Sequence, residues 1–147
     1  MVFETLATLS TGLFAGAAIY ITAVEHPARM ECGTDLAIRE FAPSYRRATV
    51  MQASLAAIGF LMAIAAWLTS GSVWWLVGGA ILVAVIPFTL LIILPTNKKL
   101  LDPSLDKGSE LASRLLVRWG TLHMVRSLLS LISFLIFLFL LSPSHLK

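Results

Sequence analysis

The chain has 147 residues, of which 58% are hydrophobic and only 13% are charged, and its mean hydropathy is +0.87. Such an apolar composition excludes an ordinary soluble domain and indicates an integral membrane protein. The formal net charge is +3, but the basic residues stand beside apolar segments and are mixed with acids. This pattern marks membrane topology and excludes a nucleic-acid-binding protein.

The length is that of one ordinary domain, and no Ser/Gly-rich linker or low-complexity tract divides it. Residues 1–147 are therefore predicted to form a single integral membrane domain. Cys32 is the only cysteine, which excludes an internal disulfide and any cysteine-based zinc or iron–sulfur site within one chain. The first residues contain Glu4 but no Lys or Arg, so the first apolar segment is expected to be retained rather than cleaved as a signal peptide.

Four apolar segments are each long enough to cross a hydrocarbon core about 30 Å thick as a helix. None of them shows the alternation of a β-barrel strand, so the predicted fold class is all-α, a four-helix transmembrane bundle. Only Ser70-Gly71-Ser72 separates the second segment from the third, which predicts a tight turn between antiparallel neighbours. The predicted spans cover residues 6–24, 48–69, 73–94 and 120–141.

The two remaining connections, residues 25–47 and 95–121, are long and rich in Lys and Arg. The positive-inside rule therefore places both long loops in the cytoplasm and both termini on the other side of the membrane. In the second connection, Asp102-Pro103 has the pattern of a helix N-cap and first-turn proline. Leu111, Leu115 and Trp119 follow at four-residue intervals, which predicts a helix that continues into the fourth span.

The fourth span carries polar side chains into the membrane. Residues 127–141 alone are too few to cross the bilayer, so the span is predicted to begin near Gly120 and to include His123 and Arg126. Trp119, His123 and Arg126 are spaced i, i+4 and i+7, so they share one helix face.

An arginine inside a span costs on the order of 2.5 kcal/mol or more unless it snorkels or finds a partner. The shared face therefore favours the lining of a site. A snorkelling Arg126, or an ion pair between Arg126 and Glu25 that fixes helix register, is the structural alternative.

The alternating topology brings the ends of the other three spans to the level at which the fourth span enters. Hydrogen-bonding groups from all four helices are therefore predicted to converge in a cleft open to the inner leaflet. His26 before Pro27 also fits a simple helix terminus, and Asn97 also fits a C-cap. The candidates contributed by the first three spans are Glu25, His26, Tyr45, Thr96 and Asn97.

These residue types suit proton abstraction from an apolar carbon acid that enters from the lipid. A neutral histidine can act as a general base near pH 7, and Asn97 with Arg126 can stabilise a developing oxyanion. Glu25, His26 and His123 are also metal-ligand types, but no close ligand spacing such as HxxxH supports a metal or a bis-histidine haem. No cofactor is therefore expected, and a metal- or haem-bearing redox protein is kept as an alternative.

Several short motifs follow one another along nearly the whole chain. They are Gly12-xxx-Gly16-xxx-Tyr20 leading to Glu25-His26-Pro27-Ala28-Arg29, then Pro87-Phe88-Thr89, Pro95-Thr96-Asn97 and Trp119-Gly120-xx-His123-xx-Arg126. In order and placement they resemble the anthrone oxygenase-like (noranthrone monooxygenase) family of small four-helix membrane proteins.

The resemblance implies oxidation of an anthrone-type polycyclic phenol to the quinone by dioxygen, without a bound organic cofactor. Removing a proton from the doubly benzylic carbon gives an electron-rich anion that can reduce dioxygen, so the protein need only deprotonate, stabilise the anion and exclude water. Our hypothesis assigns His123 as base and His26 as a second acid/base group. Asn97 and Arg126 are assigned as anion stabilisers, Trp119 as a stacking wall, and Glu25, Tyr45 and Thr96 as further substrate-binding residues.

A non-enzymatic membrane protein, acting in binding, transport or assembly, is the competing class. Four spans without an internal repeat argue against a self-sufficient secondary transporter, although a homo-oligomer could form a pore. The partners expected for the enzyme are a small apolar aromatic substrate from the lipid phase, dioxygen and membrane lipid, with no nucleic acid.

Overall fold

The computed structural model describes residues 1–142 of the chain, and these are all-helical without strands. Four continuous helices, residues Val2–Glu31, Thr34–Ser70, Trp74–Leu100 and Glu110–Leu140, are long and apolar enough to cross a membrane. The predicted fold class is therefore confirmed. Each helix overlaps one predicted span and continues beyond it at the same end of the bundle.

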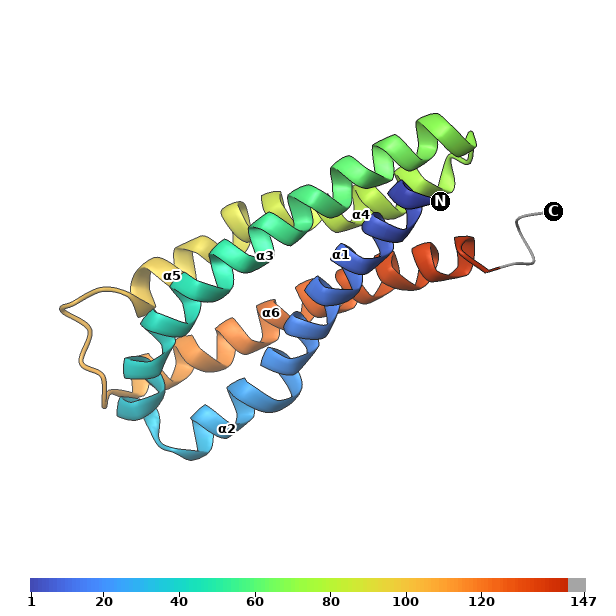
Figure 1. Cartoon of the computed structure of the whole chain (residues 1–147). Helices are drawn as coiled ribbons and strands as arrows, with labels where there is room; N and C mark the ends of the chain where they lie inside the picture. The colour runs from blue at the N-terminus through green and yellow to red at the C-terminus, as the bar shows by residue number, and fades with distance from the viewer. Residues whose placement is uncertain (143–147) are drawn as a thin grey trace.

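The bundle has an up-and-down topology in which sequence neighbours run antiparallel (Figure 1). α1 packs against α3 and α6, and α4 packs against the same two helices on the other side. The elements in chain order are α1 Val2–Tyr20, the π-helix η1 Ile21–Glu25, α2 His26–Glu31, α3 Thr34–Ser70, α4 Trp74–Phe88, the π-helix η2 Thr89–Ile93, α5 Leu94–Leu100 and α6 Glu110–Leu140.

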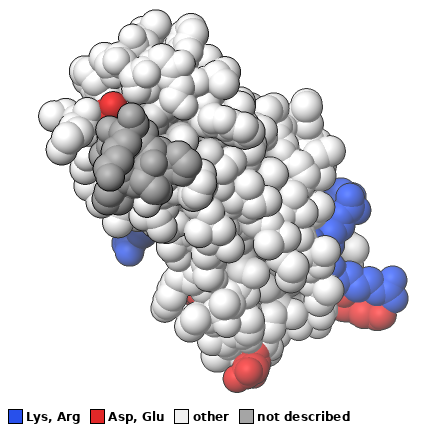
Figure 2. All heavy atoms as spheres, turned by 90° about the vertical axis from the view of Figure 1, so that its right-hand side faces the viewer, with Lys and Arg blue, Asp and Glu red and all other residues white. Residues whose placement is uncertain are grey.

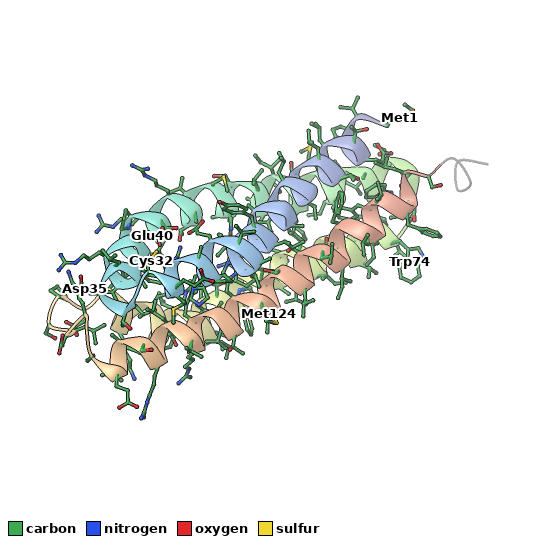
Figure 3. The ribbon with its side chains drawn as sticks, turned by 90° about the horizontal axis from the view of Figure 1, so that it is seen from below. Met1, Cys32, Asp35, Glu40, Trp74 and Met124 are labelled. Carbon is green, nitrogen blue, oxygen red and sulfur yellow. The ribbon has the colours of Figure 1, made fainter. Side chains whose placement is uncertain are left out.

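The two ends of the bundle differ in charge. One end carries α2, α5 and the loop 101–109, and we call it the charged end; the other carries the N-terminus and the last turn of α6, and we call it the terminus end (Figure 1). Viewed end-on, the terminus end shows few charged atoms (Figure 2). Cys32, Asp35 and Glu40 lie at the charged end, whereas Met1 and Trp74 lie at the terminus end (Figure 3). The prediction that the charged end faces the cytoplasm depends on this difference in charge between the two ends.

The predicted tight turn between the second and third helices is present. α3 ends at Ser70 and α4 begins at Trp74. Gly71 has a φ of 74°, a left-handed conformation that glycine adopts without the steric cost of a Cβ atom. The turn holds α3 and α4 side by side.

The first long connection differs from the predicted loop because most of it is helix. The only interruption is at Cys32 and Gly33, where Gly33 has a φ of 89°. α3 continues for 37 residues, about 55 Å at the rise of an α-helix, so its first turns extend past the hydrocarbon core. Hydropathy alone did not reveal this extension, because its apolar residues occupy only one face and pack on the charged-end core. Those buried residues are Ala37, Ile38 and Phe41.

The predicted helix start at Asp102-Pro103 is wrong. The Asp102 carboxylate accepts hydrogen bonds from the backbone N–H and the hydroxyl of Ser104, at 2.8 and 2.7 Å, which closes a turn instead of opening a helix. α6 begins at Glu110, after Ser109, whose hydroxyl accepts from the Ala112 N–H at 3.2 Å. The predicted continuity of this helix with the fourth span is correct.

Two prolines explain the two π-helical segments. Pro27 and Pro95 each lack the N–H that would bond to the carbonyl four residues earlier, and their rings crowd that carbonyl. These carbonyls belong to Ala23 and Leu91, in the middle of η1 and η2. The backbone widens by one residue at both places, and such π-bulges change which side chains face the bundle. Both lie close to the charged end, after α1 and α4.

Candidate functional site

A small cavity lies among the four helices near the charged end. Its volume is about 20 Å³, which is room for one water-sized group. It therefore replaces the open cleft expected from the sequence, and none of the residues that line it is Asp or Glu. The lining residues are Ile21, Arg29, Phe41, Ser44, Tyr45, Ala48, Thr49, Gln52, Asn97, Trp119, His123 and Arg126.

The cavity is rich in hydrogen-bond donors. Arg126 Nη2 donates to Gln52 Oε1 at 2.6 Å, and because a guanidinium only donates, the amide oxygen of Gln52 must face it. The Nε2 group of Gln52 is then left as a donor. This nitrogen, the Nε of Arg126 and both polar atoms of Asn97 are buried without a hydrogen-bond partner among residues 1–142.

An unpartnered buried polar group costs about 1–3 kcal/mol, so three such residues around one small cavity need an explanation. Unpartnered donors on residues that line a space without a carboxylate are suited to hold a negatively charged oxygen. Arg126 has no ion pair within the described chain; its other contact is the ring of Phe14, whose centroid lies 5.8 Å from the guanidinium carbon. The alternative ion pair between Arg126 and Glu25 is not formed, since Glu25 pairs with Arg29.

Trp119 lies between the two histidines. Its ring stacks on His123 with centroids 4.8 Å apart and contacts His26 at 5.2 Å. His26 is buried but does not line the cavity. It packs against the backbone of Gly120, where an added Cβ atom would stand 2.5 Å from His26 Nε2. Gly120 is therefore the residue that admits the His26 ring.

A chain of hydroxyl groups fixes the orientation of His123. Thr22 Oγ1 lies 3.0 Å from His123 Nδ1 and 2.7 Å from Ser127 Oγ, and Ser127 Oγ lies 2.9 Å from the Ala18 carbonyl oxygen. A carbonyl only accepts, so the Ser127 hydroxyl donates to it and in turn accepts from Thr22. Thr22 then accepts from His123 Nδ1–H. The order of these bonds assigns the neutral ring a protonated Nδ1 and leaves Nε2 with its lone pair.

Thr22→Val removes this acceptor, and we expect the His123 ring to lose its single tautomer. The measurement is the imidazole nitrogen NMR spectrum of histidine-labelled protein, with His26→Gln used to assign the signals. Thr89→Val is the matched control, because Thr89 lies in the other π-segment and its hydroxyl donates only to the Val85 carbonyl, at 2.7 Å. A wild-type His123 signal with an unprotonated Nδ1 would contradict the assignment.

The other candidate residues are distributed unequally around the cavity. Tyr45 lines it and stacks on Phe41 with centroids 5.7 Å apart. Thr96 is buried but is not among the lining residues. Glu25 does not line the cavity, and its carboxylate accepts hydrogen bonds from Arg29 and from the Ser44 hydroxyl.

Sequence reasoning missed several participants. Gln52 is the only amide within residues 48–69, and this isolated polar residue in an apolar span was the available signal. Thr22 and Ser127 gave no such signal, because hydroxyl residues are common in membrane helices and usually bond to their own backbone. Arg29 was counted as a loop charge, yet it is buried, and its Nε lies 2.7 Å from Glu40 Oε2.

Within residues 1–142, no group of three or more His, Cys, Asp or Glu side chains is placed to hold a metal ion.

The fold and this cavity define a class of protein: a small four-helix membrane bundle with a histidine and a set of buried N–H donors at one end. The profile of the family described as Anthrone oxygenase matches residues 41–136, well over half of the chain, and the chain belongs to that family. Comparisons with curated proteins and with solved structures gave no match. The matched segment contains the three residues with unpartnered donors at the cavity, together with Trp119 and His123, whereas His26 and Thr22 lie outside it.

Proposed function

We propose that this protein oxidises an anthrone-type polycyclic phenol to the corresponding quinone with dioxygen. The observation that carries the proposal is the set of unpartnered N–H donors on Gln52, Asn97 and Arg126 around a cavity that His123 also lines. A general base beside an oxyanion site can remove a proton from a carbon that is conjugated through aromatic rings with a ketone. Family membership supports the same reaction class.

The chemistry follows from the substrate. His123 Nε2 takes a proton from the doubly benzylic CH₂ group, and the electron pair moves into the ring system so that negative charge develops on the carbonyl oxygen. The donors of Asn97, Gln52 and Arg126 hold this oxygen. The anion reduces dioxygen and forms a carbon–oxygen bond at the same carbon, and the protonated His123 returns its proton to the resulting peroxide anion, which gives a hydroperoxide. Loss of water from the hydroperoxide then gives the second carbonyl, so one substrate and one O₂ yield one quinone and one H₂O.

In this scheme the protein orients the substrate, stabilises the negative charge of its anion and excludes water from the reaction. A cavity of about 20 Å³ is smaller than the ring system, so most of the ring system lies outside it, with the CH₂ group at the cavity mouth within reach of His123 Nε2. The electrons come from the substrate anion, and the reaction so written needs no organic cofactor. His26 lies on the far side of Trp119 and serves as the second acid/base group. The charged end faces the cytoplasm, and the substrate arrives from the lipid.

The test is dioxygen consumption by the purified wild-type protein in detergent with a simple hydroxyanthrone. We expect quinone to appear at the same rate as dioxygen disappears, above the spontaneous oxidation measured with heat-denatured protein. Parallel assays with a chelator and with added metal ions determine whether a metal contributes. A rate equal to the spontaneous one under all these conditions would refute the proposal and favour a binding or assembly role.

A further inference from the structure

The cavity cannot contain a tricyclic substrate, so the ring system needs a second space that adjoins it. A groove of about 520 Å³ lies between the end of α1 and the first membrane turns of α3. This volume falls within the range of about 300–1,000 Å³ that is usual for small-molecule sites. We propose that this groove binds the flat aromatic body of the substrate and is its entrance from the membrane, an inference that rests on the proposed function.

Proximity to the cavity is the first argument. Ile21, Ser44 and Ala48 line both spaces, so the groove adjoins the cavity and only these side chains separate the two. The larger space at the terminus end, about 950 Å³ and lined by residues that include Trp74 and Leu135, shares no lining residue with the cavity. A substrate bound there would be separated from His123 by most of the bundle.

The chemistry of the groove is the second argument. Its apolar lining comes from Ala17, Ile21, Pro43 and Met51, which suits a ring system that dissolves in lipid. Tyr20 is exposed at its edge and offers a further aromatic contact. The exposure of Tyr20 puts this edge of the groove on the outer surface of the bundle.

Pairing of the two carboxylates that line the groove is the third argument, and Arg47 is the remaining charged residue of the lining. The carboxylates of Glu25 and Glu40 both pair with the buried Arg29 behind the groove. Ser44 donates to Glu25 at 2.6 Å and lies 3.3 Å from Arg29 Nη2, so one hydroxyl of the groove lining is tied to this ion pair. Ser44 could exchange its hydrogen bond to Glu25 for one to a phenolic hydroxyl of the substrate, which would hold the substrate against the groove. Glu25 would remain paired with Arg29.

The experiment measures binding of the unreactive product, a hydroxyanthraquinone, by quenching of tryptophan fluorescence in detergent. Ala17→Phe adds bulk to the groove from α1 and is expected to weaken binding about tenfold or more, the scale on which loss of a well-packed contact acts. Leu135→Phe adds bulk to the terminus-end space without adding a tryptophan and is the matched control, which should bind like the wild type. In turnover assays, Ala17→Phe should raise KM and leave kcat nearly unchanged.

A second measurement uses the unaltered protein. A hydroxyanthraquinone that carries a photoreactive group should label residues between 17 and 51, and labelling confined to 132–141 would overturn the inference. Unchanged binding in Ala17→Phe, or no binding to the wild type, would overturn it as well. Binding in the groove without turnover would support the groove as a binding site and refute the proposed oxidation. Turnover that is insensitive to Ala17→Phe would support the oxidation and refute the groove as the binding site.

Discussion

His123→Gln is expected to lower the turnover of a hydroxyanthrone by about 10²–10⁴-fold, the usual contribution of a general base. Glutamine retains a polar side chain that can hydrogen-bond to Thr22, but it cannot accept a proton near neutral pH. The measurement is kcat from quinone formation under saturating dioxygen, together with the thermal unfolding midpoint in the same detergent. The prediction is a loss of kcat with little change in that midpoint.

Met124→Leu is the matched control for this variant. Met124 is the next residue on α6, but it is 49% exposed and lies on the outer surface of the bundle (Figure 3). It should keep wild-type turnover. If His123→Gln retained full activity, His123 would not be the base. A fall in activity that only matched a fall in the amount of folded protein would assign it a structural role.

Asn97→Leu should separate function from stability. Leucine has a similar shape and removes the two side-chain atoms that are buried without a partner. Relief of these unsatisfied groups is expected to leave the protein as stable as the wild type or more stable, by up to about 1–3 kcal/mol. Loss of one oxyanion donor should nevertheless lower kcat by about 10²–10³-fold.

Stability and kcat are expected to change in opposite directions only if the side chain of Asn97 binds a ligand. Unfolding is followed by the decrease in folded protein on gel filtration after heating, and turnover is followed as for His123. Ser54→Ala is the control, since the Ser54 hydroxyl is exposed and donates to its own helix at Val50 O, at 2.9 Å. A less stable Asn97→Leu protein with unchanged turnover per folded molecule would show that Asn97 serves the fold and not the reaction.

The membrane class, the four spans and the antiparallel pairing at Ser70–Ser72 could all be predicted from the amino-acid sequence. Helix length against bilayer thickness and the absence of room for a longer connection decide these features locally. The spacing of Trp119, His123 and Arg126 was equally local, because i, i+4 and i+7 positions share a face in any α-helix.

Which groups meet at the cavity depends on how the four helices pack. Gln52 holds Arg126 across 74 residues of sequence, and Thr22 reaches His123 across 101. Neither contact has a sequence pattern, since each depends on helix rotation and on the extra residue that the π-segment before Pro27 inserts into the first helix.

The same limit explains the two errors at the charged end. Hydropathy over a window describes how apolar a segment is, but not whether its single apolar face finds a core, as the face of Phe41 does. The Asp102-Pro103 pattern is compatible with a helix start and with a turn. The hydrogen bonds that Ser104 donates to the Asp102 carboxylate stabilise the turn. Long-range packing and competing local hydrogen bonds are fixed only when the whole bundle forms.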